Sequence, residues 1–287
     1  MNTVDLITLA LAEDAANHDI TAQATIGVNL QASARIIAKA KGVLSGVGLA
    51  RQLFSTRDPE LQQVWPLRDG QAVQGGDVVA TITGSARSIL SAERVALNFL
   101  QHLSGIATAT HAVVQRIADT HCTVADTRKT TPGLRALEKQ AVVHGGGINH
   151  RPDLAGGFLI KENHIAATGS IAEAIARCRA SAATGWIEVE CETLDEVSQA
   201  VACAPEMILL DNMTPDQVAA ARALVPESIT LEASGGITAA NARDYALRGV
   251  DRIAMGSITH SAAALDLSLL ITTQIDSGFS DSKAKKP

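Results

Sequence analysis

A regular alternation of short β-branched runs with alanine-rich stretches, between residues 111 and 263, restricts the fold of this chain more than any other feature. Runs of this length predict strands, and the stretches between them have the length and composition of helices. The predicted strands are Thr123–Ala125, Phe158–Ile160, Ile187–Val189, Met207–Leu210, Ile229–Ala233 and Arg252–Ala254. The predicted helices lie near residues 133–143, 170–182, 193–202, 214–224 and 238–248. A strand followed by a helix, repeated along the segment, indicates a parallel sheet that curls into an α/β barrel.

A doubly wound open sheet is the competing fold for such a pattern. It is disfavoured because no GxGxxG motif follows a predicted strand. Two of the predicted helices also carry recognisable starts, which are Thr214-Pro215 and Thr238.

Residues 1–110 have a different pattern, with glycines punctuating short segments. The predicted elements are helices over residues 4–15, 49–54 and 88–103 and strands over residues 32–40 and 78–82. We therefore expect two domains: an α/β sandwich-like N-terminal domain over residues 1–110 and an incomplete parallel α/β barrel over residues 111–263. Residues 264–287 are a candidate for packing on the first domain, and their polar, basic end is expected to be disordered.

Composition excludes several functional classes. The net charge is −6 and aromatic residues make up 2% of the chain, so we expect neither nucleic-acid binding nor binding to acidic membranes. No apolar run has the length of a membrane span. The four cysteines lack CxxC or metal-ligand spacing, and the N-terminus lacks the pattern of a signal peptide. We therefore expect a cytoplasmic protein with reduced thiols.

Polar, charged or glycine residues follow every predicted strand of the barrel at its carboxyl end. These ends meet at one edge of a parallel barrel, which is where active sites form. The segments concerned are residues 126–133, Lys161–His164, Glu190, Asp211–Asn212, Ser234–Gly236 and Gly256–Ser257. The sequence therefore predicts that all of them contribute to one site.

The residues of this predicted site suit an anionic ligand and a sugar. The cationic or potentially cationic side chains match carboxylates or phosphates, and the triple glycine 145–147 allows backbone N–H groups to approach an anion. These side chains are Arg128, Lys129, His150, Arg151 and Lys161. Glu190 and Asp211 suit ribose hydroxyls or Mg²⁺. Ser234-Gly235-Gly236, before a helix expected near Thr238, is typical of a phosphate pocket at a helix N-terminus.

Five further residues have open interpretations. Glu188 either shares the role of Glu190 or, as we expect, is a buried partner that lines the barrel. Glu232 alternates with Ala233 and is expected to point into the helix layer. The residues Glu162, Asn163 and His164 either shape the loop after Lys161 or contact substrate.

Several blocks of the sequence resemble those of quinolinate phosphoribosyltransferases, also called carboxylating nicotinate-nucleotide pyrophosphorylases. The most specific similarity covers residues 126–135, 138–142, 145–151 and 159–165. It continues through residues 93–100, 188–190, 209–213 and 231–237. One small departure is His18-Asp19-Ile20-Thr21, where the family often has Gly-Asp-Ile-Thr.

The resemblance implies an enzyme of de novo NAD biosynthesis that converts quinolinate and phosphoribosyl pyrophosphate, with Mg²⁺, to nicotinate mononucleotide, pyrophosphate and CO₂. It implies quinolinate binding by Arg128, His150, Arg151 and Lys161, with Thr127 also at the substrate. It places Lys129 near the pyrophosphate. It places Glu190 and Asp211 at the ribose and, directly or indirectly, at the metal. Lys129, Glu190 and Asp211 would be catalytic. The 5′-phosphate would be held by Ser234, Gly235, Gly236, Gly256 and Ser257. The family's homodimer implies that Arg94 reaches the site of a neighbouring subunit.

Two other functions remain as alternatives. A paralogous family associated with molybdenum transport departs from the Lys-Glu-Asn-His run that this chain has at 161–164. A non-enzymatic sensor of quinolinate or a phosphosugar would be expected to lack Glu190, Asp211 or Lys129, and the chain has all three.

Overall fold

The computed structural model describes residues 3–273 of the chain. They divide into two compact units, one formed by residues up to Gly105 together with those from Ala264 onward, and the other by Ile106–Ala263. The basic tail, whose disorder was expected from the sequence, lies outside the described residues. The four cysteines are free thiols. Within the described residues, no helix combines the length and apolar character needed to cross a bilayer.

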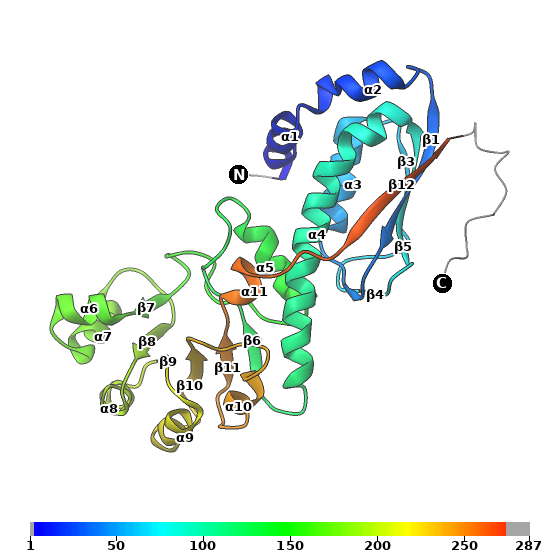
Figure 1. The fold of residues 1–287 in the computed structure, drawn as a ribbon. Coiled ribbons are helices and arrows are strands. Elements are labelled where there is room, and N and C mark those ends of the chain that lie inside the picture. Colours follow the sequence, from blue (N-terminus) through cyan, green and yellow to red (C-terminus); the bar gives the residue numbers. More distant parts are fainter. Residues whose placement is uncertain (1–2, 274–287) are drawn as a thin grey trace. The chain divides into compact units, whose positions relative to one another are not determined.

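The first unit contains a four-stranded sheet in the order β12-β1-β5-β3 and a two-stranded β2-β4 ladder (Figure 1). Its strands are β1 (Gln31–Ala38), β2 (Gly42–Val43), β3 (Gln62–Val64), β4 (Ala72–Val73), β5 (Val78–Ser85) and β12 (Leu267–Thr273). Its helices are α1 (Thr3–Glu13), η1 (Ala16–His18), α2 (Ile20–Thr25) and α3 (Val47–Arg57), and α4 (Ala86–Arg116) begins in it.

Strand β1 is the centre of this antiparallel sheet. Every second residue from Ala32 to Ala38 is buried, so one face of the strand contributes to the core. β1 pairs with β5 on one side and with β12 on the other, from Ala32 opposite Thr273 to Ala38 opposite Leu267. β12 thus returns the chain to the first unit after the whole second unit.

The second unit is a parallel sheet with helices outside it (Figure 1). Its strands are β6 (Thr123–Ala125), β7 (Phe158–Ile160), β8 (Ile187–Cys191), β9 (Met207–Asp211), β10 (Thr230–Ser234) and β11 (Arg252–Ala254). Its helices are α5 (Arg135–His144), α6 (Glu162–Thr168), α7 (Ile171–Ala180), α8 (Leu194–Ala202), α9 (Pro215–Leu224), α10 (Ala242–Ala246) and α11 (Ser257–His260).

The strand order shows an incomplete barrel, which confirms the predicted fold class. From β7 to β11 each strand lies beside the next one in the chain, and β11 then pairs with β6. A closed barrel would also pair β6 with β7, and these two strands are the edges of the sheet. On the free side of β6, Ile148 forms a single parallel bridge with Ala125. The loop that contains the triple glycine therefore runs along this edge.

The predicted helix starts have different outcomes. Thr214 is the N-cap of α9 as expected, because its side chain accepts the Gln217 N–H and Pro215 occupies the first turn. The predicted start at Thr238 is wrong, since α10 begins at Ala242. The reason is that the Asn241 side chain accepts bonds from the Thr238 N–H and hydroxyl and stabilises a turn ahead of the helix.

The parallel register decides which side chains face the barrel interior. Glu190, Leu209 and Glu232 are direct neighbours on β8, β9 and β10. Because side chains alternate along a strand, these three point to one side, and the buried apolar residues next to each point to the other. The expectation that Glu232 points into the helix layer is therefore wrong. The charged residues of these strands line the inside of the barrel.

Candidate functional site

A pocket of about 410 Å³ opens at the carboxyl ends of the barrel strands. It is lined by Thr127, Arg128, Lys129, His150, Arg151, Leu159, Lys161, Glu190, Leu209, Asp211, Glu232, Ser234 and Ala254. Nine of these residues were predicted from the sequence to belong to the site. Sequence reasoning missed the other four, which are Leu159, Leu209, Glu232 and Ala254. Their positions could have revealed them, because each either precedes a predicted site residue by two positions or lies opposite one in the sheet.

Six lining residues form what we call the pocket rim, which is partly or fully exposed to solvent. The pocket rim consists of Thr127, Arg128, Lys129, Lys161, Glu190 and Asp211. Thr127, Arg128 and Lys129 lie on the loop after β6, and the Thr127 hydroxyl accepts the Lys129 N–H at 3.0 Å. The Thr259 hydroxyl donates to the Lys129 carbonyl at 2.7 Å and anchors the same loop.

The two arginines of the pocket create an excess of positive charge. Arg128 Nε is buried and has no hydrogen-bond partner among the described residues. Burial and, after it, the nearby Arg128 lower the pKa of the Arg151 guanidinium. Two guanidinium groups in one pocket, one with an unsatisfied N–H, favour an anionic ligand at both.

The rim carboxylates lie on neighbouring strands. Glu190 forms an ion pair with Lys161, whose side chain is 44% exposed, against 13% for Glu190. Asp211 accepts a bond from the Asn212 amide at 2.7 Å. Asn212 has a positive φ of 55° at the end of β9, a conformation that asparagine tolerates better than most residues. Asn212 belongs to a segment that was predicted to reach the site, but its bond to Asp211 was not predicted.

The predicted phosphate-binding residues are distributed over two turns. Ser234 lines the pocket. Gly235 has a φ of +87°, and a Cβ there would lie 2.2 Å from Asn212 Oδ1, so the turn requires glycine. Beside Gly236 a Cβ would meet no atom within 4 Å. At Gly256 a Cβ would lie 2.8 Å from Lys129 Cδ, which brings this turn and the start of α11 at Ser257 next to Lys129.

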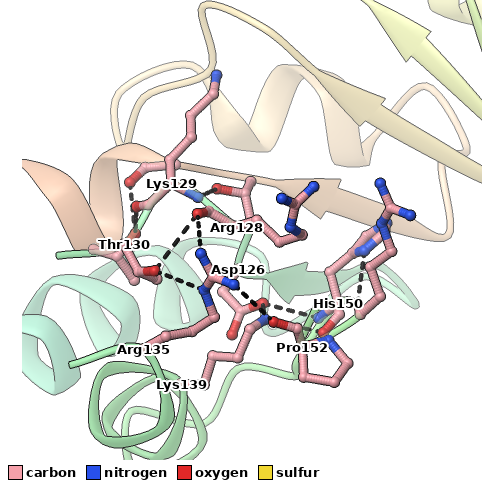
Figure 2. Close-up of polar contacts among 12 residues, drawn as sticks. Asp126, Arg128, Lys129, Thr130, Arg135, Lys139, His150 and Pro152 are labelled. Carbon is pink, nitrogen blue, oxygen red and sulfur yellow. Dashed lines mark hydrogen bonds and ion pairs between the residues drawn. The ribbon is translucent and has the colours of Figure 1, made fainter. Parts of the chain in front are cut away.

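Beneath and beside the pocket rim lies a second set of charged residues, which we call the buried cluster. It consists of Asp126, Lys139, His150, Glu188 and Glu232, all of which are buried. Lys139 forms an ion pair with Asp126 and donates to the His150 carbonyl at 2.9 Å (Figure 2). The His150 N–H donates to Asp126 at 2.9 Å. Figure 2 also shows the Lys129 side chain extending away from these contacts.

Two carboxyl groups of the buried cluster lie close together in the barrel interior. Glu188 accepts from or pairs with His150 Nε2 at 2.8 Å, and Glu232 lies 3.6 Å from the same nitrogen. Burial, and then the Glu188 charge, raise the pKa of Glu232 well above its ordinary value. Burial also raises the pKa of Asp126, although Lys139 opposes this shift. The expectation that Glu188 is a buried barrel-lining residue agrees with its position.

The remaining predicted residues are not among those that line the pocket. Arg94 is exposed on α4 in the first unit. Glu162, Asn163 and His164 form the first turn of α6, and His164 Nδ1 accepts the Lys161 N–H at 3.0 Å. His164 therefore shapes the chain after Lys161, the first of the two roles considered for this segment.

Comparisons with known proteins agree across both units. Residues 19–104 match the N-terminal domain, and residues 106–270 the C-terminal domain, of quinolinate phosphoribosyl transferase. A Bacillus subtilis protein named as a probable carboxylating nicotinate-nucleotide pyrophosphorylase is 42% identical, over 92% of this chain and 92% of its own. The Mycobacterium leprae carboxylating nicotinate-nucleotide pyrophosphorylase is 40% identical, over 92% of this chain and 95% of its own.

A solved structure shows the same fold. The nicotinate-nucleotide pyrophosphorylase from Francisella tularensis superposes with a TM-score of 0.89 at 37% identity and covers 94% of this chain and 96% of its own. Similarity of this extent, over both domains and with the same order of elements, identifies the family. The chain belongs to the quinolinate phosphoribosyl transferase family.

Proposed function

We propose that this chain transfers the phosphoribosyl group of phosphoribosyl pyrophosphate to quinolinate and releases nicotinate mononucleotide, pyrophosphate and CO₂. The names of its relatives support the reaction. The observation that carries it is the pair of arginines, Arg128 and Arg151, in one pocket with Lys161. A small dianion would satisfy the unpaired Arg128 N–H and relieve the repulsion between the guanidinium groups.

Quinolinate would bind at the cationic side of the pocket. Its two adjacent carboxylates match the bidentate geometry of arginine side chains, and Lys161 adds a point charge. Lys161 is paired with Glu190, so substrate binding would loosen or share this ion pair. Thr127 lies beside Arg128 on the same loop and would help to hold the ring in place.

The sugar donor would bind next to quinolinate, near Glu190 and Asp211. Loss of pyrophosphate builds positive charge at C1 of the ribose, and nearby carboxylates stabilise this charge in the transition state. Lys129 would stabilise the leaving pyrophosphate. Attack by the pyridine nitrogen then makes the ring cationic, so the adjacent carboxylate leaves as CO₂ and its electron pair stays on the ring carbon, which takes up a proton.

The carboxylates Glu190 and Asp211 suit a magnesium ion that is also bound by the substrate's phosphates. Mg²⁺ typically takes one or two protein carboxylates together with water and phosphate oxygens, and these two groups lie on adjacent strands in the pocket rim. Asp211 keeps one oxygen for the Asn212 amide and has the other for a ligand or metal-bound water. When bound, the ion would neutralise charge on the pyrophosphate as it leaves.

The 5′-phosphate would bind at the turns after β10 and β11. Ser234 lines the pocket and offers a hydroxyl, and Gly235, Gly236 and Gly256 have no side chain that would keep a phosphate from their backbone N–H groups. Ser257 begins the four-residue helix α11 and would add a second hydroxyl. The phosphate would thus be held by hydrogen bonds, and not by the dipole of a long helix.

The chain is further proposed to act as a cytoplasmic homodimer in which the exposed Arg94 of one subunit completes the quinolinate site of the other. The resemblance of residues 93–100 to the family supports this arrangement. Mixing inactive Arg94→Ala chains with inactive Lys161→Ala chains should restore activity, because some mixed dimers keep one complete site. Restoration that is absent although mixed dimers form would contradict the shared site.

The reaction itself is tested by incubating the purified chain with phosphoribosyl pyrophosphate, Mg²⁺ and quinolinate. Nicotinate mononucleotide and CO₂ should form in equal amounts and only when all three are present. A control reaction contains nicotinate in place of quinolinate. It should give no product, because nicotinate has one carboxylate fewer for the arginine pair. Turnover with nicotinate and none with quinolinate would overturn the proposed function.

A further inference from the structure

Every polar group of His150 has a partner within the protein. Its N–H donates to Asp126 at 2.9 Å, and its carbonyl accepts from Lys139 at 2.9 Å. The imidazole Nδ1 accepts the backbone N–H of Arg151 at 2.7 Å, and Nε2 lies 2.8 Å from Glu188 Oε2. The ring also packs edge-on against Trp186, with a centroid distance of 5.4 Å and an angle of 83°.

These contacts determine the tautomer of the ring. An imidazole nitrogen that accepts a hydrogen bond carries no proton, so the bond from Arg151 places the proton on Nε2. Nε2–H then donates to Glu188. The nearest side-chain atoms of His150, Glu188 and Glu232 lie within 4.8 Å of one another, as in a metal site. An Nε2 that holds a proton cannot bind a metal ion, so the geometry favours the hydrogen bond.

Arg151 is held by the same group of residues. Its backbone N–H is tied to the His150 ring, and its Nη1 donates to the Gly157 carbonyl at 2.9 Å. A Cβ at Gly157 would lie 2.5 Å from the Trp186 ring, so Gly157 and His150 both pack on this tryptophan. The orientation of the Arg151 guanidinium therefore depends on the His150 ring and on what holds that ring.

We propose that His150 and Glu188 are positioning residues that orient Arg151 for the substrate carboxylates, and that the His150 ring itself does not bind substrate. The proposal rests on the proposed function for the identity of the substrate. The resemblance implied that His150 binds quinolinate. The proposal replaces this role, because both ring nitrogens already form hydrogen bonds within the protein. It also gives Glu188 a function, which is to keep the proton on Nε2.

The kinetic test compares two substitutions of Glu188. Glu188→Met removes the acceptor and should raise the KM for quinolinate about 10-fold, the effect of one lost hydrogen bond, while the KM for phosphoribosyl pyrophosphate stays within about 2-fold. Glu188→Gln should restore quinolinate binding, because the amide oxygen still accepts Nε2–H. Glu173→Met, on the exposed surface of α7, is the matched control. Equal increases in both KM values, or no rescue by glutamine, would overturn the proposal.

A second measurement needs no substrate and so is independent of the proposed function. In ¹⁵N-histidine-labelled protein, the His150 signals, identified by their loss in His150→Gln, should show the neutral Nε2–H tautomer. An imidazolium or an Nδ1–H tautomer would contradict the proposal, as would a metal ion that remains bound after dialysis and is lost in Glu188→Gln. This spectrum also decides the matter if Glu188→Met does not fold. Failure to form nicotinate mononucleotide would instead contradict the proposed function and leave the tautomer result intact.

Discussion

The pocket rim and the buried cluster contain the same kinds of side chain in opposite situations. In the pocket rim, Arg128 keeps an unsatisfied N–H and Lys161 is nearly half exposed. In the buried cluster, Lys139 pairs with Asp126 and the His150 carbonyl, and both ring nitrogens of His150 are bonded to protein groups. The difference teaches that a cation near an anion site is not by itself a ligand-binding cation. Its partners decide whether its charge serves the substrate or the fold.

The largest effect is expected for a substitution of Lys139, which removes an ion pair from the buried cluster. Lys139→Met leaves the Asp126 carboxylate buried without its cation, which costs roughly 3–5 kcal/mol of the free energy of unfolding. Urea denaturation of the purified variant measures this loss. The matched control is Lys129→Met, which removes a lysine of the pocket rim. It should unfold like the wild type and yet lose activity about 10²- to 10³-fold.

Similar stabilities for the two lysine variants would contradict the comparison. So would a Lys129→Met variant that keeps full activity, because the pocket rim would then lack a catalytic cation at this position. The double variant Asp126→Asn, Lys139→Met should recover much of the stability, since it leaves no unpaired buried charge. Its activity would show how far the orientation of His150 depends on the ion pair.

A smaller effect concerns the pH dependence of stability through Glu232. Its pKa is raised in the folded chain, so above the ordinary glutamate pKa the native state holds a proton that the unfolded state has lost. Stability from this group is full below that pKa and falls as the pH rises. Glu232→Gln mimics the protonated form and so should not lose this stability as the pH rises. The variant should therefore gain stability relative to wild type as the pH rises above the ordinary glutamate pKa.

Urea denaturation of both proteins at several pH values measures the Glu232 effect. The difference between variant and wild type is informative, because the other titrating groups cancel. A difference that is constant with pH would show that Glu232 is ionised in the fold. A difference that shrinks as the pH rises would have the wrong sign for a raised pKa.

The sequence by itself determined the parallel sheet and most of the pocket lining. Short β-branched runs define the strands β6 to β11, and the carboxyl ends of parallel strands must meet at one edge. Thr127, Lys161 and Asp211 could therefore be placed in one pocket without knowledge of their contacts. The packing of residues 264–287 on the first domain was expected, but the strand β12 was not predicted, because its pairing with β1 joins residues that lie far apart in the sequence.

Only the tertiary structure decided what the buried residues do. Alternation along β10 shows that Glu232 and Ala233 face opposite sides, and only the register with β9 shows which side is the interior. In the same way, the sequence placed His150 among the cations of an anion site. The bonds from Arg151 and to Glu188 use both of its ring nitrogens. Residue types set the chemistry that is available, and packing sets which groups remain free to perform it.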